Sequence, residues 1–511
     1  SLVALFTEYA HAVTFARTYG GISDDYASSV QRTPDGGYIV AGITGSFGAG
    51  LDDIFLIKTD ANGNVIWAKT YGGINWGTGY DWAYSVQQTS DGGYIVAGLT
   101  SFFGPGYSDI FLIKTDANGN VIWVKTYGGI DYERAYSVQQ TSDGGYIVAG
   151  YTDSFGAGYE DIFLIKTDAN GDVQWAKAYG GTSVDVAYSV QQTSDGGYIV
   201  AGLTSFFGPG YSDIFLIKTD ANGDVQWAKT YGGTNDEWAE SVQQTSDGGY
   251  IVAGYTDSFG AVNWDVFLIK TDTNGNIIWA KTYGGAGLDV AYSVQQTSDG
   301  GYIVAGYTDS FGAVNWDVFL IKTDANGDVQ WAKTYGGTND EWAESVQQTS
   351  DGGYIVAGGT RSFGAGYYDA FLVKTDANGN IGSCSIVQNV TPTVITPSPT
   401  VNTPSPSVSF PSIVINSISP TIAFPTLTVS EPCPLSISES CQIASSIITP
   451  YKGGIKITKS GEFEVKVYNV SGVMVKSVKG KDEVKIDLSR GVYFVDVVSG
   501  GKVIREKVVI R

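Results

Sequence analysis

Short apolar runs separated by glycine turns recur along most of this chain with a fixed period. The tetrapeptide Asp-Gly-Gly-Tyr occurs seven times, with a spacing of 56 residues once and then 52 residues five times. Its first residues are Asp35, Asp91, Asp143, Asp195, Asp247, Asp299 and Asp351. A period of this length is typical of an array of one supersecondary unit.

One repeat, residues 135–181, shows what that unit is. Four short runs rich in β-branched and aromatic residues predict strands over 135–141, 146–152, 162–168 and 173–179. Asp143-Gly144-Gly145 separates the first two runs and Asn170-Gly171 the last two. Asn-Gly between strands is a strong hairpin signal because both residues tolerate positive φ. Four antiparallel strands per repeat are the pattern of a β-propeller blade.

The two ends of the array predict a closed ring. The seventh repeat has no fourth strand after Asn378-Gly379, whereas residues 13–19 (VTFARTY) match the fourth-strand motif ahead of the first repeat. Pairing of this segment with the last blade would close seven blades and leave no exposed sheet edge. The expected fold is therefore an all-β, seven-bladed β-propeller over residues 13–385. Six tryptophans that recur in the fourth strand, with Phe15 in the seventh copy, are expected to pack between blades.

Charge is distributed unevenly along the chain. The net charge is −22, but residues 1–385 hold 43 acids and 17 bases, and residues 452–511 hold 7 acids and 13 bases. An acidic ring repels phosphates, so nucleic acid is not an expected partner. No segment reaches the length of a membrane span. Residues 1–12 are expected to be either the remnant of a secretory signal, ending in Ala10-His11-Ala12, or a free strand able to pair with a second copy.

Composition changes abruptly after Cys384. Ten of the 14 prolines lie between Pro392 and Pro434, among Thr and Ser with almost no charge. This composition predicts an extended linker over residues 386–445. Asn389 and Asn469 each begin an N-glycosylation triplet, and Thr/Ser/Pro stretches are common acceptors of O-linked sugar.

The three cysteines fit no zinc or haem spacing. In an oxidising compartment we favour a Cys433–Cys441 bridge, with Cys384 bonded to either of them as the alternative.

Residues 446–511 alternate apolar and polar positions between glycine turns, which predicts a small immunoglobulin-like β-sandwich. Val467-Tyr468-Asn469-Val470-Ser471-Gly472, Ile486-Asp487-Leu488-Ser489, Gly491-Val492-Tyr493 and Lys507-Val508-Val509 resemble the C-terminal sorting domain of the type IX secretion system. That resemblance implies export across an outer membrane and a location outside the cell or at its surface. The repeats resemble those of secreted propeller proteins with the SDGGYIVAG…FLIKTDANGN unit, which says nothing firm about activity.

The usual catalytic constellations are absent from the sequence of the ring. The one histidine of the chain, His11, lies outside the ring, so neither a Ser-His-Asp triad nor a histidine metal site is expected within it. Carboxylates recur in every blade, as Asp53 and Asp60 do in the first, and such repetition favours structural turns over catalysis or calcium binding. We therefore expect no cofactor, no metal and no enzymatic activity.

Function is expected where the repeats differ, which is at the rim formed by the loops between strands two and three and between blades. These loops are aromatic and stand beside acidic residues. Aromatic faces of this kind suit sugar rings or a protein partner, whereas local packing over the blade tips is the competing interpretation. The candidate residues are Trp76, Tyr80, Trp82, Phe103, Tyr107, Tyr132, Phe207, Tyr211, Trp238, Trp264, Trp316 and Trp342.

The sequence is consistent with three functional hypotheses. The first is a non-catalytic extracellular surface protein for adhesion, or for assembly into a surface layer or filament through residues 1–12 or the C-terminal domain. The second is a lectin-like carbohydrate-binding propeller. The third is a secreted polysaccharide-active enzyme that uses ring carboxylates.

Overall fold

The computed structural model describes residues 13–48, 50–73, 79–313, 315–382, 384–398, 400–402, 407–409, 414–417, 421–423, 428–436, 448–451, 454–469, 474–488, 491–499 and 502–510. The elements in these ranges are all β-strands, and none of the described residues belongs to a helix that could cross a membrane. The chain divides into two compact units, residues 1–438 and 439–511.

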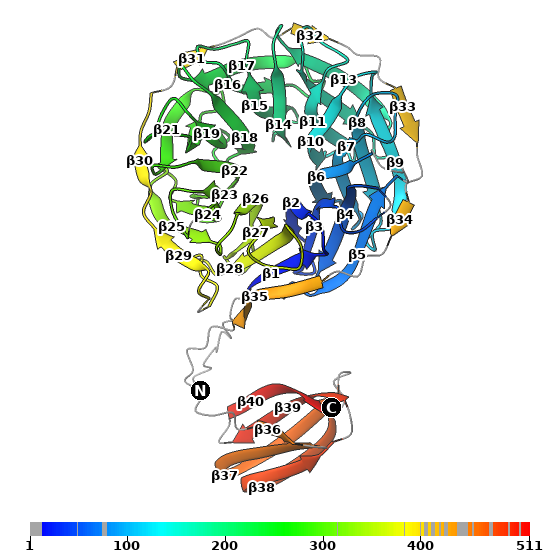
Figure 1. Ribbon diagram of the computed structural model, residues 1–511, viewed down its shortest axis with the longest axis vertical. Coiled ribbons are helices and arrows are strands. Elements are labelled where there is room, and N and C mark those ends of the chain that lie inside the picture. The colour runs from blue at the N-terminus through cyan, green and yellow to red at the C-terminus, as the bar shows by residue number, and fades with distance from the viewer. Residues whose placement is uncertain are drawn as a thin grey trace, which may run out of the picture. The chain divides into compact units, whose positions relative to one another are not determined.

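Seven twisted sheets form a ring, as Figure 1 shows. Blades one to four consist of β2 (Asp25–Arg32), β3 (Tyr38–Thr44), β4 (Asp53–Thr59) and β5 (Val65–Gly72); β6 (Asp81–Gln88), β7 (Tyr94–Thr100), β8 (Asp109–Thr115) and β9 (Val121–Gly128); β10 (Glu133–Gln140), β11 (Tyr146–Thr152), β12 (Asp161–Thr167) and β13 (Val173–Gly180); and β14 (Asp185–Gln192), β15 (Tyr198–Thr204), β16 (Asp213–Thr219) and β17 (Val225–Gly232). Blades five to seven consist of β18 (Glu237–Gln244), β19 (Tyr250–Thr256), β20 (Asp265–Thr271) and β21 (Ile277–Gly284); β22 (Asp289–Gln296), β23 (Tyr302–Thr308), β24 (Asp317–Thr323) and β25 (Val329–Tyr335); and β26 (Glu341–Gln348), β27 (Tyr354–Thr360), β28 (Asp369–Thr375) and β1 (Thr14–Gly20).

The ring closes as the sequence predicts. β1 pairs antiparallel with β28, with Phe15 opposite Lys374 and Thr18 opposite Phe371. The first strand of the array therefore completes the last blade. Both faces of these second strands are covered, since every residue of β7, β11 and β15 is buried, and this explains why their sequences are apolar without strict alternation.

Aromatic residues join each blade to the next. The buried Tyr179 of β13 donates its hydroxyl hydrogen to the carbonyl oxygen of Gly223 in the following blade, at 2.7 Å. Trp175, of the recurring tryptophan series, meets Tyr198 of that blade edge to face, with ring centroids 5.8 Å apart. The expected packing between blades is confirmed at this position, and the same contacts recur around the ring.

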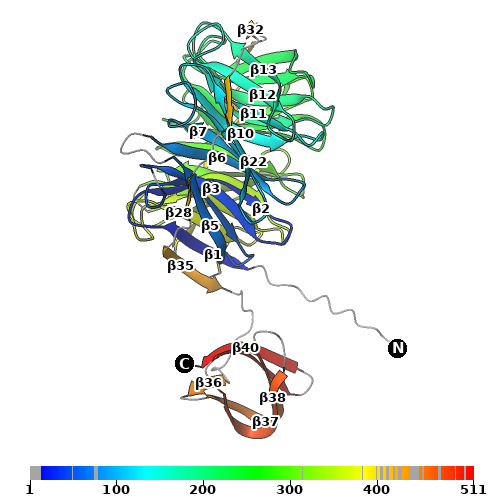
Figure 2. The ribbon, with the colours of Figure 1, turned by 90° about the vertical axis from the view of Figure 1, so that its right-hand side faces the viewer.

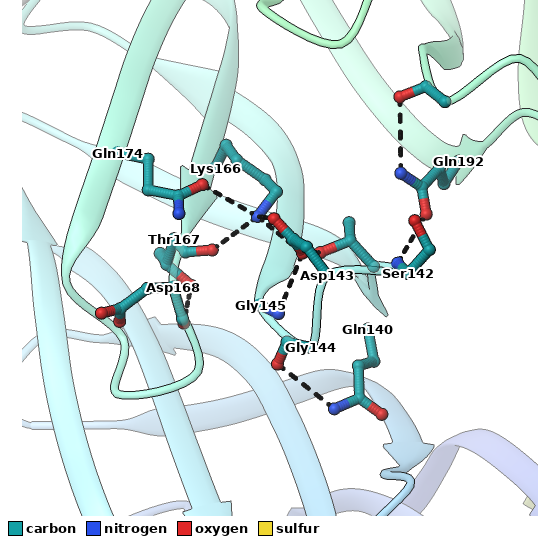
Figure 3. Close-up of polar contacts among 12 residues, drawn as sticks. Gln140, Ser142, Asp143, Gly144, Gly145, Lys166, Thr167, Asp168, Gln174 and Gln192 are labelled. Carbon is teal, nitrogen blue, oxygen red and sulfur yellow. Dashed lines mark hydrogen bonds and ion pairs between the residues drawn. The ribbon is translucent and has the colours of Figure 1, made fainter.

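One rim of the ring is nearly identical in every blade, and Figure 3 shows its polar contacts in blade three. The buried ammonium of Lys166 contacts Asp143 Oδ2 at 2.8 Å and donates to the carbonyl oxygen of Thr167 at 2.8 Å. In the neighbouring turn, Asp168 Oδ1 accepts the backbone N–H of Asn170 at 2.8 Å. These aspartates hold turns, as their repetition in the sequence indicates.

The segment expected to be a linker instead contributes a fifth strand to every blade. Short strands from residues 387–436 pair antiparallel with the outermost strand of each sheet, and Figures 1 and 2 show them on the outside of the ring. They are β29 (Val387–Val390), β30 (Thr393–Ile395), β31 (Thr400–Asn402), β32 (Ser407–Ser409), β33 (Val414–Ser417), β34 (Thr421–Ala423) and β35 (Thr428–Ser436). We call these seven strands the belt. It passes from blade six back to blade one and ends on β1 in blade seven.

A seven-residue spacing sets the register of the belt. A valine or isoleucine occurs at every seventh position from residue 387 to 429. Each one lies opposite the buried tyrosine of an outer strand, in the pairs Val387–Tyr335, Val394–Tyr283, Val401–Tyr231, Val408–Tyr179, Ile415–Tyr127, Ile422–Tyr71 and Val429–Tyr19. β-Branched residues favour strands, and prolines between them suit a strand at a sheet edge. The spacing therefore matches one belt strand to one blade.

A disulfide bond is formed by the cysteine that immediately precedes the belt. Cys384, just before β29, is disulfide-bonded. The chain has only two other cysteines, so the partner is Cys433, which lies in β35 opposite Ala16, or Cys441, outside the described residues. The favoured Cys433–Cys441 bridge is thus wrong, and one of the alternative pairings holds. The bond closes a loop of chain whose strands contact all seven blades.

The second unit is also all-β. It consists of β36 (Ile448–Tyr451), β37 (Gly454–Asn469), β38 (Met474–Asp487), β39 (Gly491–Ser499) and β40 (Lys502–Ile510), with β37 paired to β36, β38 and β39. Ile457, Val465, Val467 and Val495 are fully buried in its core. An immunoglobulin-like arrangement stays a prediction. Of the glycosylation candidates, Asn389 is exposed in β29, and Asn469 ends β37.

Candidate functional site

A β-bulge in the first strand of every blade directs one side chain toward the centre of the ring. In blade three Ala135 pairs with Gly150 and Ser137 with Ala149, which leaves Tyr136 without a partner across the strand. The same irregularity occurs in all seven blades. Bulges re-aim side chains in this way and are common beside functional sites. The bulge residues are Ser28, Tyr84, Tyr136, Tyr188, Glu240, Tyr292 and Glu344.

All seven bulge residues line one cavity of about 480 Å³, which we call the vestibule. Tyr26, Trp82 and Trp342 add further aromatic surface to its wall. The first strands differ mainly at this bulge position and at the second residue of the strand, so the vestibule is where the symmetry of the ring is broken. It is large enough for a small ligand and combines apolar faces with a few polar groups, as binding pockets do.

Beyond the vestibule the channel is built from symmetric rings. Ser137 Oγ accepts the backbone N–H of Val190 in the next blade at 3.2 Å, and Gln139 Oε1 accepts that of Gln192 at 2.5 Å. Equivalent bonds run between the blades around the ring, and the glutamines line a cavity of about 220 Å³. Because a backbone N–H can only donate, these bonds fix the amide oxygens toward the neighbouring blade. This part of the channel is a hydrogen-bonded, symmetric continuation of the vestibule.

Two glutamates are the acidic residues that line the vestibule. The pKa of Glu240 is raised to about 8, chiefly by burial and further by the nearby Glu344, against a hydrogen bond with Tyr255 that lowers it. Burial also raises the pKa of Glu344 to about 7. Both side chains are partly buried among tyrosines, so their charged forms lack the solvation they would have in water.

These shifts predict that the stability of the propeller decreases as pH rises. The folded protein retains protons on Glu240 and Glu344 at pH values where the unfolded chain, with an ordinary pKa of 4.5, has lost them. Stability therefore declines from about pH 5 to about pH 9. Glu240→Gln and Glu344→Gln should each flatten a plot of unfolding midpoint against pH, while Asp328→Asn, in an exposed turn at the other rim, should leave its slope unchanged. Parallel curves for all variants would contradict the assignment.

An arginine lies among the aromatic side chains of blades two and three, away from the two glutamates. The Arg134 guanidinium lies 5.6 to 5.9 Å from the ring centroids of Trp82, Tyr84, Tyr136 and Tyr151. It donates a hydrogen bond to the Tyr136 hydroxyl at 3.1 Å. Burial opposes the charge of this guanidinium, but the surrounding tyrosines raise its pKa overall. The protein thus supplies its own cation to one group of tyrosines.

Only some of the aromatic residues proposed from sequence lie at this site. Trp82 and Trp342 line the vestibule, and Tyr80 packs against Trp82 with ring centroids 4.9 Å apart. Trp264 and Trp316 stack on Tyr255 and Tyr307, at 4.8 and 4.7 Å. Trp238 packs between apolar clusters of neighbouring blades.

The remaining rim residues divide between surface and core. Tyr107 and Tyr132 form an exposed pair with centroids 5.2 Å apart, and Tyr211 is 77% exposed. Phe103 and Phe207 pack against buried clusters. Trp76 lies outside the described residues. Packing over the blade tips therefore accounts for several of these side chains, and the rim as a whole is not one surface.

Sequence reasoning missed the bulge residues Tyr84, Tyr136, Tyr188, Glu240, Tyr292 and Glu344. A signal was present, because the position after the alanine of the first strand changes between Tyr, Glu and Ser while the following Ser-Val repeats in every blade. Only the bulge, however, turns that variation into one wall.

Comparisons with known proteins bear on two parts of the chain. Residues 449–511 match the family model described as the secretion system C-terminal sorting domain. Regulatory protein FlaEY of Caulobacter vibrioides is 27% identical over 258 residues, which cover 45% of this chain and 26% of that protein. This chain thus spans about a quarter of that relative's length. The sorting domain indicates export by the type IX system toward the cell surface or the extracellular space.

Proposed function

We propose that this protein is a non-catalytic, exported glycan-binding adhesin, whose propeller recognises carbohydrate in the vestibule. The observation that carries the proposal is the convergence of five tyrosines, two tryptophans and two glutamates on one cavity. Four of the tyrosines and both glutamates occupy the bulge position of a first strand. Aromatic faces pack against the apolar faces of sugar rings, and carboxylates accept hydrogen bonds from their hydroxyls. The sorting domain supports placement of this head outside the cell.

Glycan-array screening followed by calorimetry tests the proposal. Tyr188→Ala should weaken binding of the selected glycan by about tenfold or more, because it removes a ring from the vestibule wall. Trp316→Ala is the matched control, since Trp316 stacks on Tyr307 at the rim and does not line the vestibule. Its affinity should stay within about twofold of the parent. An array without any binder, or equal losses in both variants, would contradict the proposal.

The two glutamates also favour a second candidate, glycoside hydrolysis. Such enzymes use a pair of carboxyl groups, one of them kept protonated by a raised pKa, and both vestibule glutamates have raised pKa values. This candidate predicts release of reducing ends from a bound polysaccharide, with loss of release in Glu240→Gln and Glu344→Gln. The adhesin predicts binding without release. Assembly of copies through residues 1–12 or the C-terminal unit stays a separate prediction from the sequence.

A further inference from the structure

The vestibule has two halves of opposite electrostatic character. In blades two and three, Tyr84 and Tyr136 face the guanidinium of Arg134. In blades five and seven, the same bulge position holds Glu240 and Glu344, and Tyr292 of blade six stands between them. The ring therefore carries a built-in cation on one side and two carboxylates on the other.

Within the described residues, no lysine or arginine forms an ion pair with either glutamate. Arg361, at the same rim, lies over Tyr368 and pairs with Asp340 at 3.8 Å. Partly buried carboxylates are costly without a counter-charge, and the charge of Glu344 further disfavours ionisation of Glu240. Their retention at a cavity wall points to a counter-charge that arrives with the ligand.

The tyrosines beside the glutamates determine what kind of cation fits. The wall here is formed by Tyr188, Tyr292 and Trp342, whose ring faces attract organic cations as well as sugar rings. A protonated amine on a sugar satisfies both requirements at once, because the ammonium pairs with carboxylates while the ring packs on an aromatic face. An N-acetylated sugar keeps the ring and loses the charge. The wall therefore discriminates between these two forms of one sugar.

We propose that the vestibule selects amino sugars with a free, protonated amine, held by Glu240 and Glu344 across from the tyrosines that face Arg134. This inference rests on the proposed glycan-binding function and names its substrate class. The ammonium lies between the two carboxylates, and the sugar ring lies over the tyrosines. Neutral and N-acetylated sugars of the same size make only the second contact.

Calorimetry with three matched probes tests this selection: oligomers of glucosamine, of N-acetylglucosamine and of glucose, at equal length. The glucosamine oligomer should bind about tenfold more tightly than the other two. Glu240→Gln or Glu344→Gln should reduce that preference to about twofold or less. Asp328→Asn removes one negative charge from the other rim, where Asp328 pairs with Lys281, and should keep the preference. Circular dichroism of each variant checks that the propeller is folded.

The possible outcomes distinguish amino-sugar selection from the proposed glycan-binding function on which it rests. Equal binding of the three oligomers, with binding lost in Tyr188→Ala, would overturn amino-sugar selection and keep the glycan-binding function. A preference for glucosamine that persists in both glutamine variants would also overturn it. Absence of binding by all three oligomers and by every glycan on an array would overturn both.

Discussion

Replacing Cys384 with serine should lower the thermal unfolding midpoint of the propeller by about 4–5 °C. The disulfide closes a loop of about 50 residues if the partner is Cys433, and loss of such a cross-link costs about 4 kcal/mol in chain entropy. A unit of about 420 residues gains about 0.9 kcal/mol/K of entropy on unfolding. Dividing the lost free energy by this entropy gives the expected decrease in the unfolding midpoint. Differential scanning calorimetry, with and without reductant, measures it.

The other two cysteines provide the control for this experiment. One of Cys433→Ser and Cys441→Ser should reproduce the shift of Cys384→Ser, and the other should leave the midpoint unchanged, because only one of them is the partner. The result also identifies the partner. A reductant-insensitive midpoint in the parent protein, or a neutral Cys384→Ser, would mean that the closed belt contributes no stability.

Gly202→Ala should destabilise the propeller by about 3 kcal/mol or more. Gly202 of β15 lies opposite the bulge of blade four, and a β-carbon added there would overlap the carbonyl oxygen of Val186. Backbone atoms cannot rotate away as a flexible side chain does, so the bulge must shift or open. Because the bulge also places Tyr188 in the vestibule, ligand binding should fall together with stability. Urea unfolding and calorimetry measure the two effects.

Gly45→Ala is the matched control for the added methyl group. The nearest atoms to a β-carbon at residue 45 are the Asp24 carbonyl oxygen and Asp52 Oδ1, both at 3.3 Å, and its backbone does not require positive φ. We expect a change within about 1 kcal/mol and unaltered binding. If Gly202→Ala were as mild as this control, the bulge would not require glycine opposite it.

The ring could be predicted from sequence because the information was repeated. Each blade carries the same turn and strand signals, and the fourth-strand motif at residues 13–19 supplied the strand that the seventh repeat lacks. Each signal is weak alone, and seven copies with one period exclude most alternatives. Even the hydrogen bonds of the turn aspartates follow from residue type.

The belt and the vestibule were not predicted, for different physical reasons. Composition of residues 386–445 indicates an unpaired linker, and the valine or isoleucine at every seventh position has meaning only beside seven outer tyrosines. The vestibule depends on a bulge, which breaks the alternation of a regular strand, so period-two reasoning assigns Tyr136 or Glu240 no special direction. The prediction that functional residues lie in the loops therefore omitted these strand positions.

The circular path of the belt imposes an order on maturation. β1 precedes all the other strands of the ring in sequence, but it can pair with β28 only after the intervening blades have been synthesised. β35 in turn pairs with β1, so it can add to blade seven only once β1 is in place. Cys384 is brought to a cysteine at or beyond the far end of the belt. A mature molecule then keeps a single free thiol, whereas one arrested before closure presents three. Thiol titration of secreted material therefore counts the fraction of molecules that have completed the circle.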